Sequence, residues 1–130
     1  MRVPRFLFSV AAILSMAGAA LHAAAFGKVS PIIAASGLPH FYSGSFKALW
    51  LADSATMALL ATICIVLTAR LQIASRWLLI LVACIPLATA TLLYTFVGNF
   101  FAGHLLLGIA GLVILAAVRL PRSASVGTQR

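Results

Sequence analysis

Three side chains in otherwise apolar stretches of this sequence have the chemistry to move a proton or bind a metal ion: His22, Asp53 and His104. Asp53 is the only acidic residue in the chain. Asp and His chains carry protons in membrane pumps, and two histidines can supply axial ligands to haem in a helical bundle. Three His and Asp ligands can also hold zinc with an open position. None of the three residues lies in a metal- or haem-binding spacing motif, so their type alone makes them candidates.

The composition indicates which solvent surrounds these residues. Apolar residues make up 64% of the chain and charged residues 8%, against roughly 45–50% and 25% in a typical soluble domain. A chain of 130 residues with this composition cannot cover its own core with polar side chains. The net charge of +8 does not predict nucleic-acid binding, because the basic residues lie in ones and twos at the ends of apolar runs. The sequence therefore predicts an integral membrane protein.

Four apolar runs predict a bundle of four transmembrane helices in a single all-α domain. Each run is close to the ~20 residues that cross a hydrocarbon core of ~30 Å, and backbone groups in lipid must be satisfied within a helix. The runs cover residues 6–26, 46–69, 77–97 and 101–118. Between the first two runs, Ser30 as a cap, Pro31 at the first position and Gly37 past the end predict a short helix on the membrane surface.

Basic residues predict the orientation of these helices. With both termini in the cytoplasm, the cytoplasmic side carries most of the basic side chains, which are Arg2, Arg5, Arg70, Arg76, Arg119, Arg122 and Arg130. Only Lys28 and Lys47 lie on the opposite side. This asymmetry follows the positive-inside rule. It predicts a multi-pass protein of the inner (plasma) membrane whose cytoplasmic arginines contact anionic lipid headgroups.

One alternative concerns the first helix. Arg2 and Arg5, an apolar stretch and then three alanines at 23–25 have the pattern of a signal peptide with a small-residue cleavage site. Cleavage after Ala25 would leave three spans and place the new amino terminus outside. The apolar run of about 16–21 residues is longer than the 7–15 residues of a signal core, so the sequence favours four spans.

In this orientation the strongly polar residues of the helices all fall in the outer leaflet. His22 lies near the outer end of the first helix, Asp53 in the first two turns of the second, and His104 in the first turn of the fourth. The other members of this candidate cluster are Thr56, Thr91, Tyr94, Thr95 and Asn99. A carboxylate at the edge of the hydrocarbon is expected to have a partner, and the two histidines are the candidates at matching depth.

Small residues predict which helix faces approach one another closely. On the first helix they recur every four positions, at Ala11, Ser15, Ala19 and Ala23. On the fourth helix, His104, Gly108 and Gly111 share a face, so we expect a neighbouring helix to pack below the histidine.

The polar cluster has two interpretations. In the first, it is a satisfied contact that holds the helices in register, since polar contacts between membrane helices contribute about 0.6 kcal/mol and at most about 1.7. In the second, His22, Asp53 and His104 bind a small ligand, a proton, or a haem or metal cofactor. Against a proton path, the inner half of the bundle has no second charged group to continue it. A Ser/His/Asp hydrolase is not expected, because Ser54 and Asp53 are adjacent on a helix and point in different directions.

The first half of the chain also carries a characteristic series of residues. It runs from His22 through Phe26-Gly27, Pro-Ile-Ile at 31–33, Ser-Gly-Leu-Pro at 36–39 and Ala-Leu-Trp at 48–50 to Asp53. This pattern resembles small uncharacterised four-helix inner-membrane proteins of bacteria, and the resemblance implies four spans and no particular activity. The sequence thus predicts a non-enzymatic structural or accessory membrane protein, without a cofactor, whose protein partner is another membrane protein or a second copy.

Overall fold

The computed structural model describes residues 2–120, and this part of the chain is all-helical. Its elements are α1 (Arg2–Ala35), α2 (His40–Ala69), the 3-10 helix η1 (Leu71–Ile73), α3 (Arg76–Phe96) and α4 (Phe101–Arg119). All four α-helices are long and apolar enough to cross a membrane. The prediction of an all-α fold with four such helices is therefore confirmed, and the fold is compatible with a multi-pass membrane protein. Arg122 and Arg130, predicted above to be cytoplasmic, lie outside the described residues.

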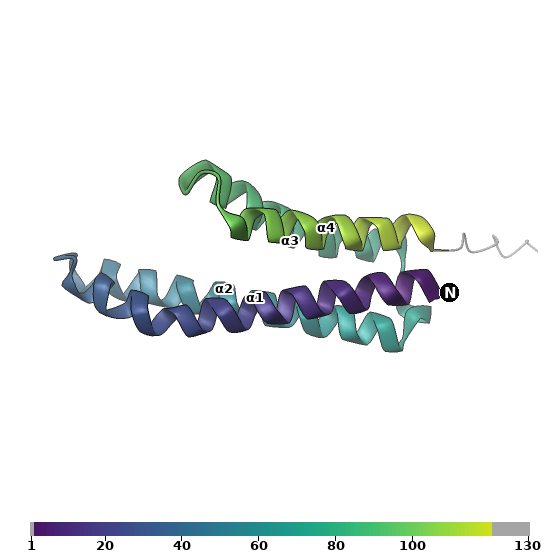
Figure 1. The fold of residues 1–130 in the computed structure, drawn as a ribbon, viewed down its shortest axis with the longest axis horizontal. Helices are drawn as coiled ribbons and strands as arrows, with labels where there is room; N and C mark the ends of the chain where they lie inside the picture. Colours follow the sequence, from purple (N-terminus) through teal and green to yellow (C-terminus); the bar gives the residue numbers. More distant parts are fainter. Residues whose placement is uncertain (1, 121–130) are drawn as a thin grey trace, which may run out of the picture.

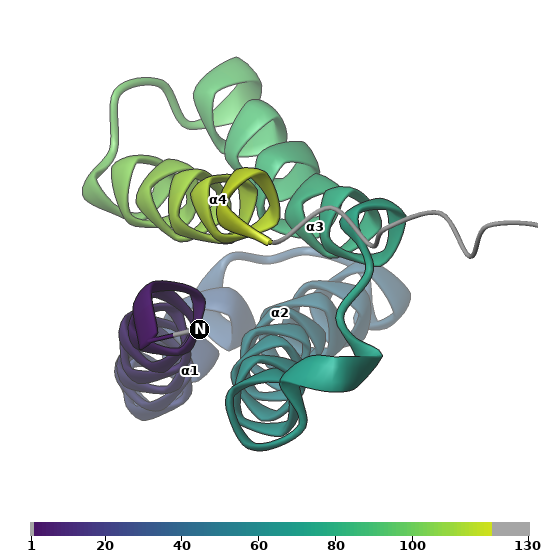
Figure 2. The same cartoon turned by 90° about the vertical axis from the view of Figure 1, so that its right-hand side faces the viewer.

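The four helices form two antiparallel hairpins, α1–α2 and α3–α4, which lie side by side (Figures 1 and 2). Helix α1 packs against both α2 and α4, and α3 packs against α4. Helices α2 and α3 scarcely touch, although only η1 and a few flanking residues separate them in the chain. Helix α1 is therefore the element that joins the two hairpins.

The expected separate surface helix between the first two spans is not present. Ser30 and Pro31 lie inside α1, which continues without interruption to Ala35. Proline removes one backbone donor, so it frees only the carbonyl four residues earlier and does not end the helix. The chain then turns at Gly37, whose φ of 70° favours glycine, and α2 begins at His40. The helical segment thus ends before Gly37 as predicted, but it is the continuation of α1 and does not begin at Ser30.

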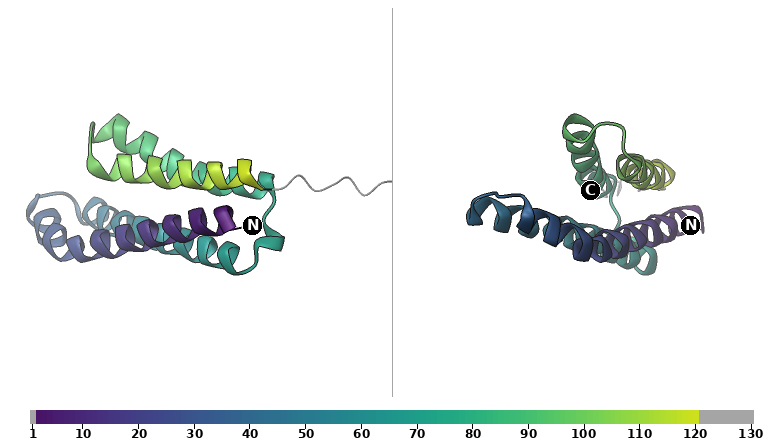
Figure 3. Two further views of the ribbon diagram at one scale, coloured as in Figure 1. Left: turned by 45° about the vertical axis from the view of Figure 1, so that its right-hand side comes forward. Right: turned by 60° about the vertical axis from the view of Figure 1, so that its left-hand side comes forward.

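The α1–α2 hairpin is much longer than the α3–α4 hairpin. At 1.5 Å per residue, α1 is about 51 Å long and α2 about 45 Å, whereas α3 and α4 are each about 30 Å long. At the end of the bundle that carries the amino terminus, the four α-helices end at about the same level. The extra length of α1 and α2 therefore extends beyond the α3–α4 turn at the other end (Figures 1 and 3). One hairpin therefore matches the thickness of a bilayer and the other exceeds it.

Large apolar side chains occupy both the interior and the outer surface of the bundle. Phe8, Cys64, Leu79 and Ile109, one from each α-helix, are fully buried. On the outside, Phe6, Leu59, Leu81 and Val118 each expose about two-thirds of their surface. A protein surrounded by water rarely exposes apolar side chains on every face, and this distribution is the one that lipid requires.

The small-residue prediction is confirmed for α1 and wrong for α4. Ala11, Ser15 and Ala19 are buried where α1 packs against its neighbours, although Ala23 is exposed. On α4, Gly108 and Gly111 are exposed and have open space where a side chain would begin. The packed face of α4 instead contains Leu106, Ile109, Ala110 and Val113.

Candidate functional site

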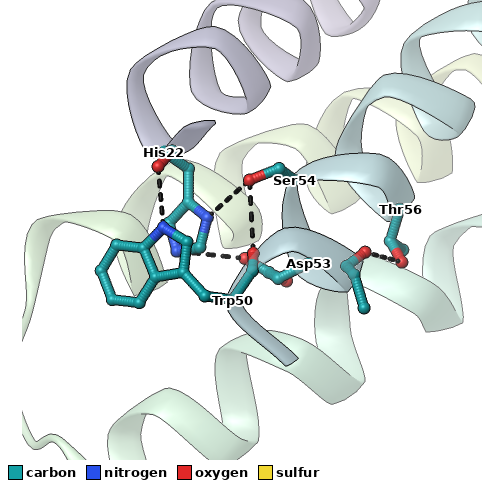
Figure 4. A network of polar contacts seen from close by, with 6 residues as sticks. His22, Trp50, Asp53, Ser54 and Thr56 are labelled. Carbon is teal, nitrogen blue, oxygen red and sulfur yellow. Dashed lines mark hydrogen bonds and ion pairs between the residues drawn. The ribbon is translucent and has the colours of Figure 1, made fainter. Parts of the chain in front are cut away.

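The structure brings His22 of α1 and Asp53 of α2 together near the far end of the membrane-length part of the bundle. The His22 Nε2 and Asp53 Oδ2 atoms are 3.6 Å apart, a distance of charge contact slightly beyond hydrogen-bond length. Three residues of α2 surround the imidazole: Trp50, Asp53 and Ser54 (Figure 4). Their spacing of three and four residues places them on one face of the helix. We call these four residues the His22–Asp53 cluster.

Trp50 fixes the position of His22 by two contacts. Its indole ring stacks on the imidazole with ring centroids 4.2 Å apart and planes 11° from parallel. Its Nε1–H also donates a hydrogen bond of 2.8 Å to the His22 carbonyl oxygen. The indole group thus contacts both the side chain and the backbone of His22, and its only hydrogen-bond donor is satisfied by this contact.

Ser54 binds the other edge of the imidazole. Its Oγ and the Nδ1 atom of His22 lie 2.9 Å apart and share a hydrogen bond whose donor depends on the tautomer. Ser54 Oγ also lies 3.3 Å from the Trp50 carbonyl oxygen, to which it can donate. Adjacent helical positions thus reach one histidine because the two ring nitrogens point in opposite directions. The different directions of Ser54 and Asp53, given above as the reason against a hydrolase, do not keep them from contacting the same histidine.

The hydrogen bond of Ser54 decides which nitrogen of His22 carries the ring proton. If Ser54 donates to Nδ1, then Nε2 carries the proton and points towards the carboxyl group. If Ser54 instead donates to the Trp50 carbonyl, Nδ1–H donates to Ser54. In both arrangements the distance of 3.6 Å between Nε2 and Oδ2 is too long for a hydrogen bond, so Trp50 and Ser54 make the hydrogen bonds that join α1 to α2 here.

Ser54, His22 and Asp53 contact one another in the same order as the residues of a hydrolase catalytic triad. Their surroundings, however, do not suit hydrolysis. Ser54 is buried, with 7% of its surface exposed, so its hydroxyl does not face a substrate. It also lies inside α2, where the neighbouring backbone N–H groups are used within the helix and are unavailable to stabilise an oxyanion. In contrast, the His22 and Asp53 side chains are 26% and 34% exposed. The His22–Asp53 pair is therefore partly accessible from outside the bundle, whereas the Ser54 side chain is not.

His104 does not join this cluster. It is exposed on α4, its Nδ1 atom lies 3.2 Å from the Phe100 carbonyl oxygen, and its ring meets that of Tyr94 edge-on at 5.6 Å. Within residues 2–120, no three His, Cys, Asp or Glu side chains lie close enough together to hold a metal ion. The three-ligand arrangement that the sequence suggested is therefore not formed by His22, Asp53 and His104.

The remaining polar candidates belong to their own helices. The hydroxyl groups of Thr56, Thr91 and Thr95 each donate to the carbonyl oxygen four residues earlier, at 2.8–2.9 Å. Such bonds satisfy a hydroxyl group on a lipid-facing surface without a second helix. Tyr94 packs against Gly103, and Asn99 is exposed in the α3–α4 turn. None of these five side chains makes a polar contact with His22 or Asp53.

Sequence reasoning missed Trp50 and Ser54 as members of the site, although a signal for them existed. Both lie on the helix face of Asp53, four residues apart, and the same face meets α1. The chain matches no protein-family model, no curated protein and no solved structure. Its function must therefore be inferred from the geometry of this site and of the helices around it.

Proposed function

We propose that this chain is a non-enzymatic structural or accessory protein of the bacterial inner membrane, with both termini in the cytoplasm. In this proposal the His22–Asp53 cluster fastens α1 to α2, and the fastened hairpin extends past the outer membrane surface towards a partner membrane protein. The observation that carries the proposal is that the polar atoms of the cluster bind one another across the two helices. A catalytic or transport site would instead leave such groups directed at an open cavity.

The position of the cluster along the hairpin supports a fastening role. Counting about 20 residues of hydrocarbon thickness from Arg5 along α1 and from Arg70 back along α2 leads to about residues 25 and 50. The cluster thus lies where the hairpin leaves the hydrocarbon. Beyond this point α1 and α2 have no support from α3 or α4 (Figure 1). A polar contact at the exit point would hold the projecting part in a fixed direction.

The distribution of basic residues supports the proposed orientation. The described arginines all lie at the end of the bundle that carries the amino terminus, and they are Arg2, Arg5, Arg70, Arg76 and Arg119. Arg76 also donates a hydrogen bond of 3.1 Å to the Leu120 carbonyl oxygen at that end. Lys28 and Lys47 lie in the opposite half of the α1–α2 hairpin. The positive-inside rule assigns the arginine-rich end to the cytoplasm.

A double-mutant cycle between α1 and α2 tests the fastening role. We expect His22→Gln and Asp53→Asn each to lower the thermal stability of the purified protein in mild detergent. The coupling energy between them should be about 0.6–1.7 kcal/mol, the range of polar contacts between membrane helices. Thr56→Val is the matched control, because its hydroxyl group bonds only within α2, and its combination with His22→Gln should show no coupling.

The alternative function, a proton or small-ligand site at the same pair, predicts a different result. Asp53→Asn would then leave stability unchanged while a bound species, visible as extra native mass in the unmodified protein, disappears. Absence of coupling together with loss of such a species would overturn the fastening role in favour of ligand binding.

A further inference from the structure

A long apolar groove lies between the first half of α1 and the last two turns of α2. Its volume is about 490 Å³, and its walls include Ala12, Ile13 and Met16 of α1 and Ile65 and Thr68 of α2. The hydroxyl group of Thr68 donates a 2.8 Å hydrogen bond to the Cys64 carbonyl oxygen, so it offers no donor to an occupant. The groove thus presents an apolar surface within the membrane-length part of the bundle.

Two arginines flank one end of this groove. Arg5 precedes the groove residue Ser9 by one helical turn, and Arg70 directly follows the groove residue Ala69. Both side chains are exposed. Neither has a carboxylate to pair with, because Asp53 is the only acidic residue of the chain and contacts His22 near the other end of the hairpin. An anion that pairs with the Arg5 and Arg70 guanidinium groups must therefore come from outside the protein.

We propose that this groove binds one anionic phospholipid, with its phosphate between Arg5 and Arg70 and one acyl chain along the groove. The direction of the groove favours a lipid of the adjoining leaflet. From Ser9 to Met16 it extends about 10 Å from the arginine pair towards the middle of the bundle, as an acyl chain extends from its headgroup into hydrocarbon. A planar guanidinium group also matches the phosphate oxygens better than an ammonium group does.

Other occupants of the groove fit the charges less well. A second copy of the chain would bring Arg5 and Arg70 towards further arginines, since the net charge is +8 and its single carboxylate is already paired. A zwitterionic lipid would lack the net negative charge that two unpaired cations attract. The corresponding groove at the far end of the hairpin, lined by Val29, Ile33 and Phe46, lies beyond the α3–α4 turn, where an acyl chain would be outside the hydrocarbon.

Native mass spectrometry of the full-length protein in mild detergent tests the headgroup contact. Phosphatidylglycerol should be retained as one molecule per chain and phosphatidylcholine with the same acyl chains should not. The double variant Arg5→Gln/Arg70→Gln should weaken this retention up to about thirtyfold, since each basic residue near a lipid phosphate contributes about fivefold. Lys28→Gln/Lys47→Gln removes the same charge at the other end and should retain the lipid unchanged. Equal loss in both double variants would overturn the proposal.

Fluorescence quenching tests the acyl-chain contact. Met16→Trp in a Trp77→Phe background places an indole in the groove, and its signal is the difference from the Trp77→Phe protein, so that Trp50 of the His22–Asp53 cluster stays unchanged. A few per cent of brominated phosphatidylglycerol in phosphatidylcholine vesicles should quench it more than brominated phosphatidylcholine does, and Arg5→Gln/Arg70→Gln should abolish the difference. Equal quenching by both lipids would mean that this position faces bulk lipid without preference for a headgroup, and it would contradict the proposal. The lipid site requires that the protein resides in a membrane. It requires neither the fastening role of the His22–Asp53 cluster nor the proposed orientation, so the lipid site and these two proposals can fail separately.

Discussion

At the scale of single residues, the His22–Asp53 contact depends on rotation about the helix axis as well as on depth in the membrane. Depth could be estimated from the sequence, and it made His22 and His104 equal candidates as partners of Asp53. The structure distinguishes them because Asp53 lies on the face of α2 that meets α1, whereas His104 lies on the exposed side of α4. The spacing of Trp50, Asp53 and Ser54 at three and four residues was visible in the sequence, but not which helix this face would meet.

Gly18 allows α1 to pack closely between its neighbours. A Cβ atom at this position would clash with Met57 Cε and lie 3.3 Å from Leu105 Cδ2. Met57 is flexible and can yield to an alanine, but a branched side chain would overfill the contact. We expect Gly18→Val to lower the free energy of unfolding by about 1–3 kcal/mol, measured by thermal unfolding in mild detergent.

Gly108→Val is the matched control for this substitution. It makes the same change on α4, where nothing lies within 4 Å of the added Cβ atom, and its stability should differ from the unmodified protein by well under 1 kcal/mol. Equal destabilisation by the two variants would mean that the close approach at Gly18 does not limit packing.

At the scale of elements, hydropathy predicted where the four helices cross the membrane but not how far they continue. The four apolar runs became helices because lipid leaves the backbone no other partner. This requirement does not hold outside the hydrocarbon, so hydropathy does not predict where the helices end there. Lys28, Ser30 and Pro31 were therefore interpreted as a break, yet the helix continues through them to Ala35. A lysine, a serine and a proline weaken an apolar pattern without ending a helix, and packing of α1 against α2 compensates for the lost hydrogen bond.

The two hairpin turns depend on glycines in the left-handed region of backbone conformation. Gly98 joins α3 to α4 with a φ of 86°, and a side chain there costs about 1–2 kcal/mol. We expect Gly98→Ala to lower the free energy of unfolding by about 1 kcal/mol in a detergent unfolding experiment. Gly44→Ala, within α2 and with open space around the added Cβ atom, should have no such effect, and equal losses would exclude backbone strain as the cause.

At the scale of the whole molecule, the unequal hairpins are the feature that sequence reasoning did not foresee. The predicted spans had 18 to 24 residues, and none of them extended beyond the thickness of the membrane by more than a few residues. Because α1 and α2 are about 20 and 15 Å longer than a bilayer core, we expect part of the hairpin to leave the membrane on the side away from the arginines. This part exposes Ile32, Phe41 and Tyr42, which favours contact with a partner over exposure to water.

The orientation of the whole molecule can be tested by labelling single cysteines in intact bacteria. Cys84 is replaced by alanine, and Cys64 stays because it is fully buried. Ser36→Cys then reports on the tip of the α1–α2 hairpin, and Gln72→Cys reports on η1. Both positions are exposed. A membrane-impermeant maleimide should label the Ser36→Cys variant in intact cells and the Gln72→Cys variant only after lysis, because the five described arginines lie at the η1 end. The reverse labelling pattern would place both termini outside. The intact mass of the labelled chain tests the first helix as well, since cleavage after Ala25 would remove His22 and with it the contact that joins α1 to Asp53.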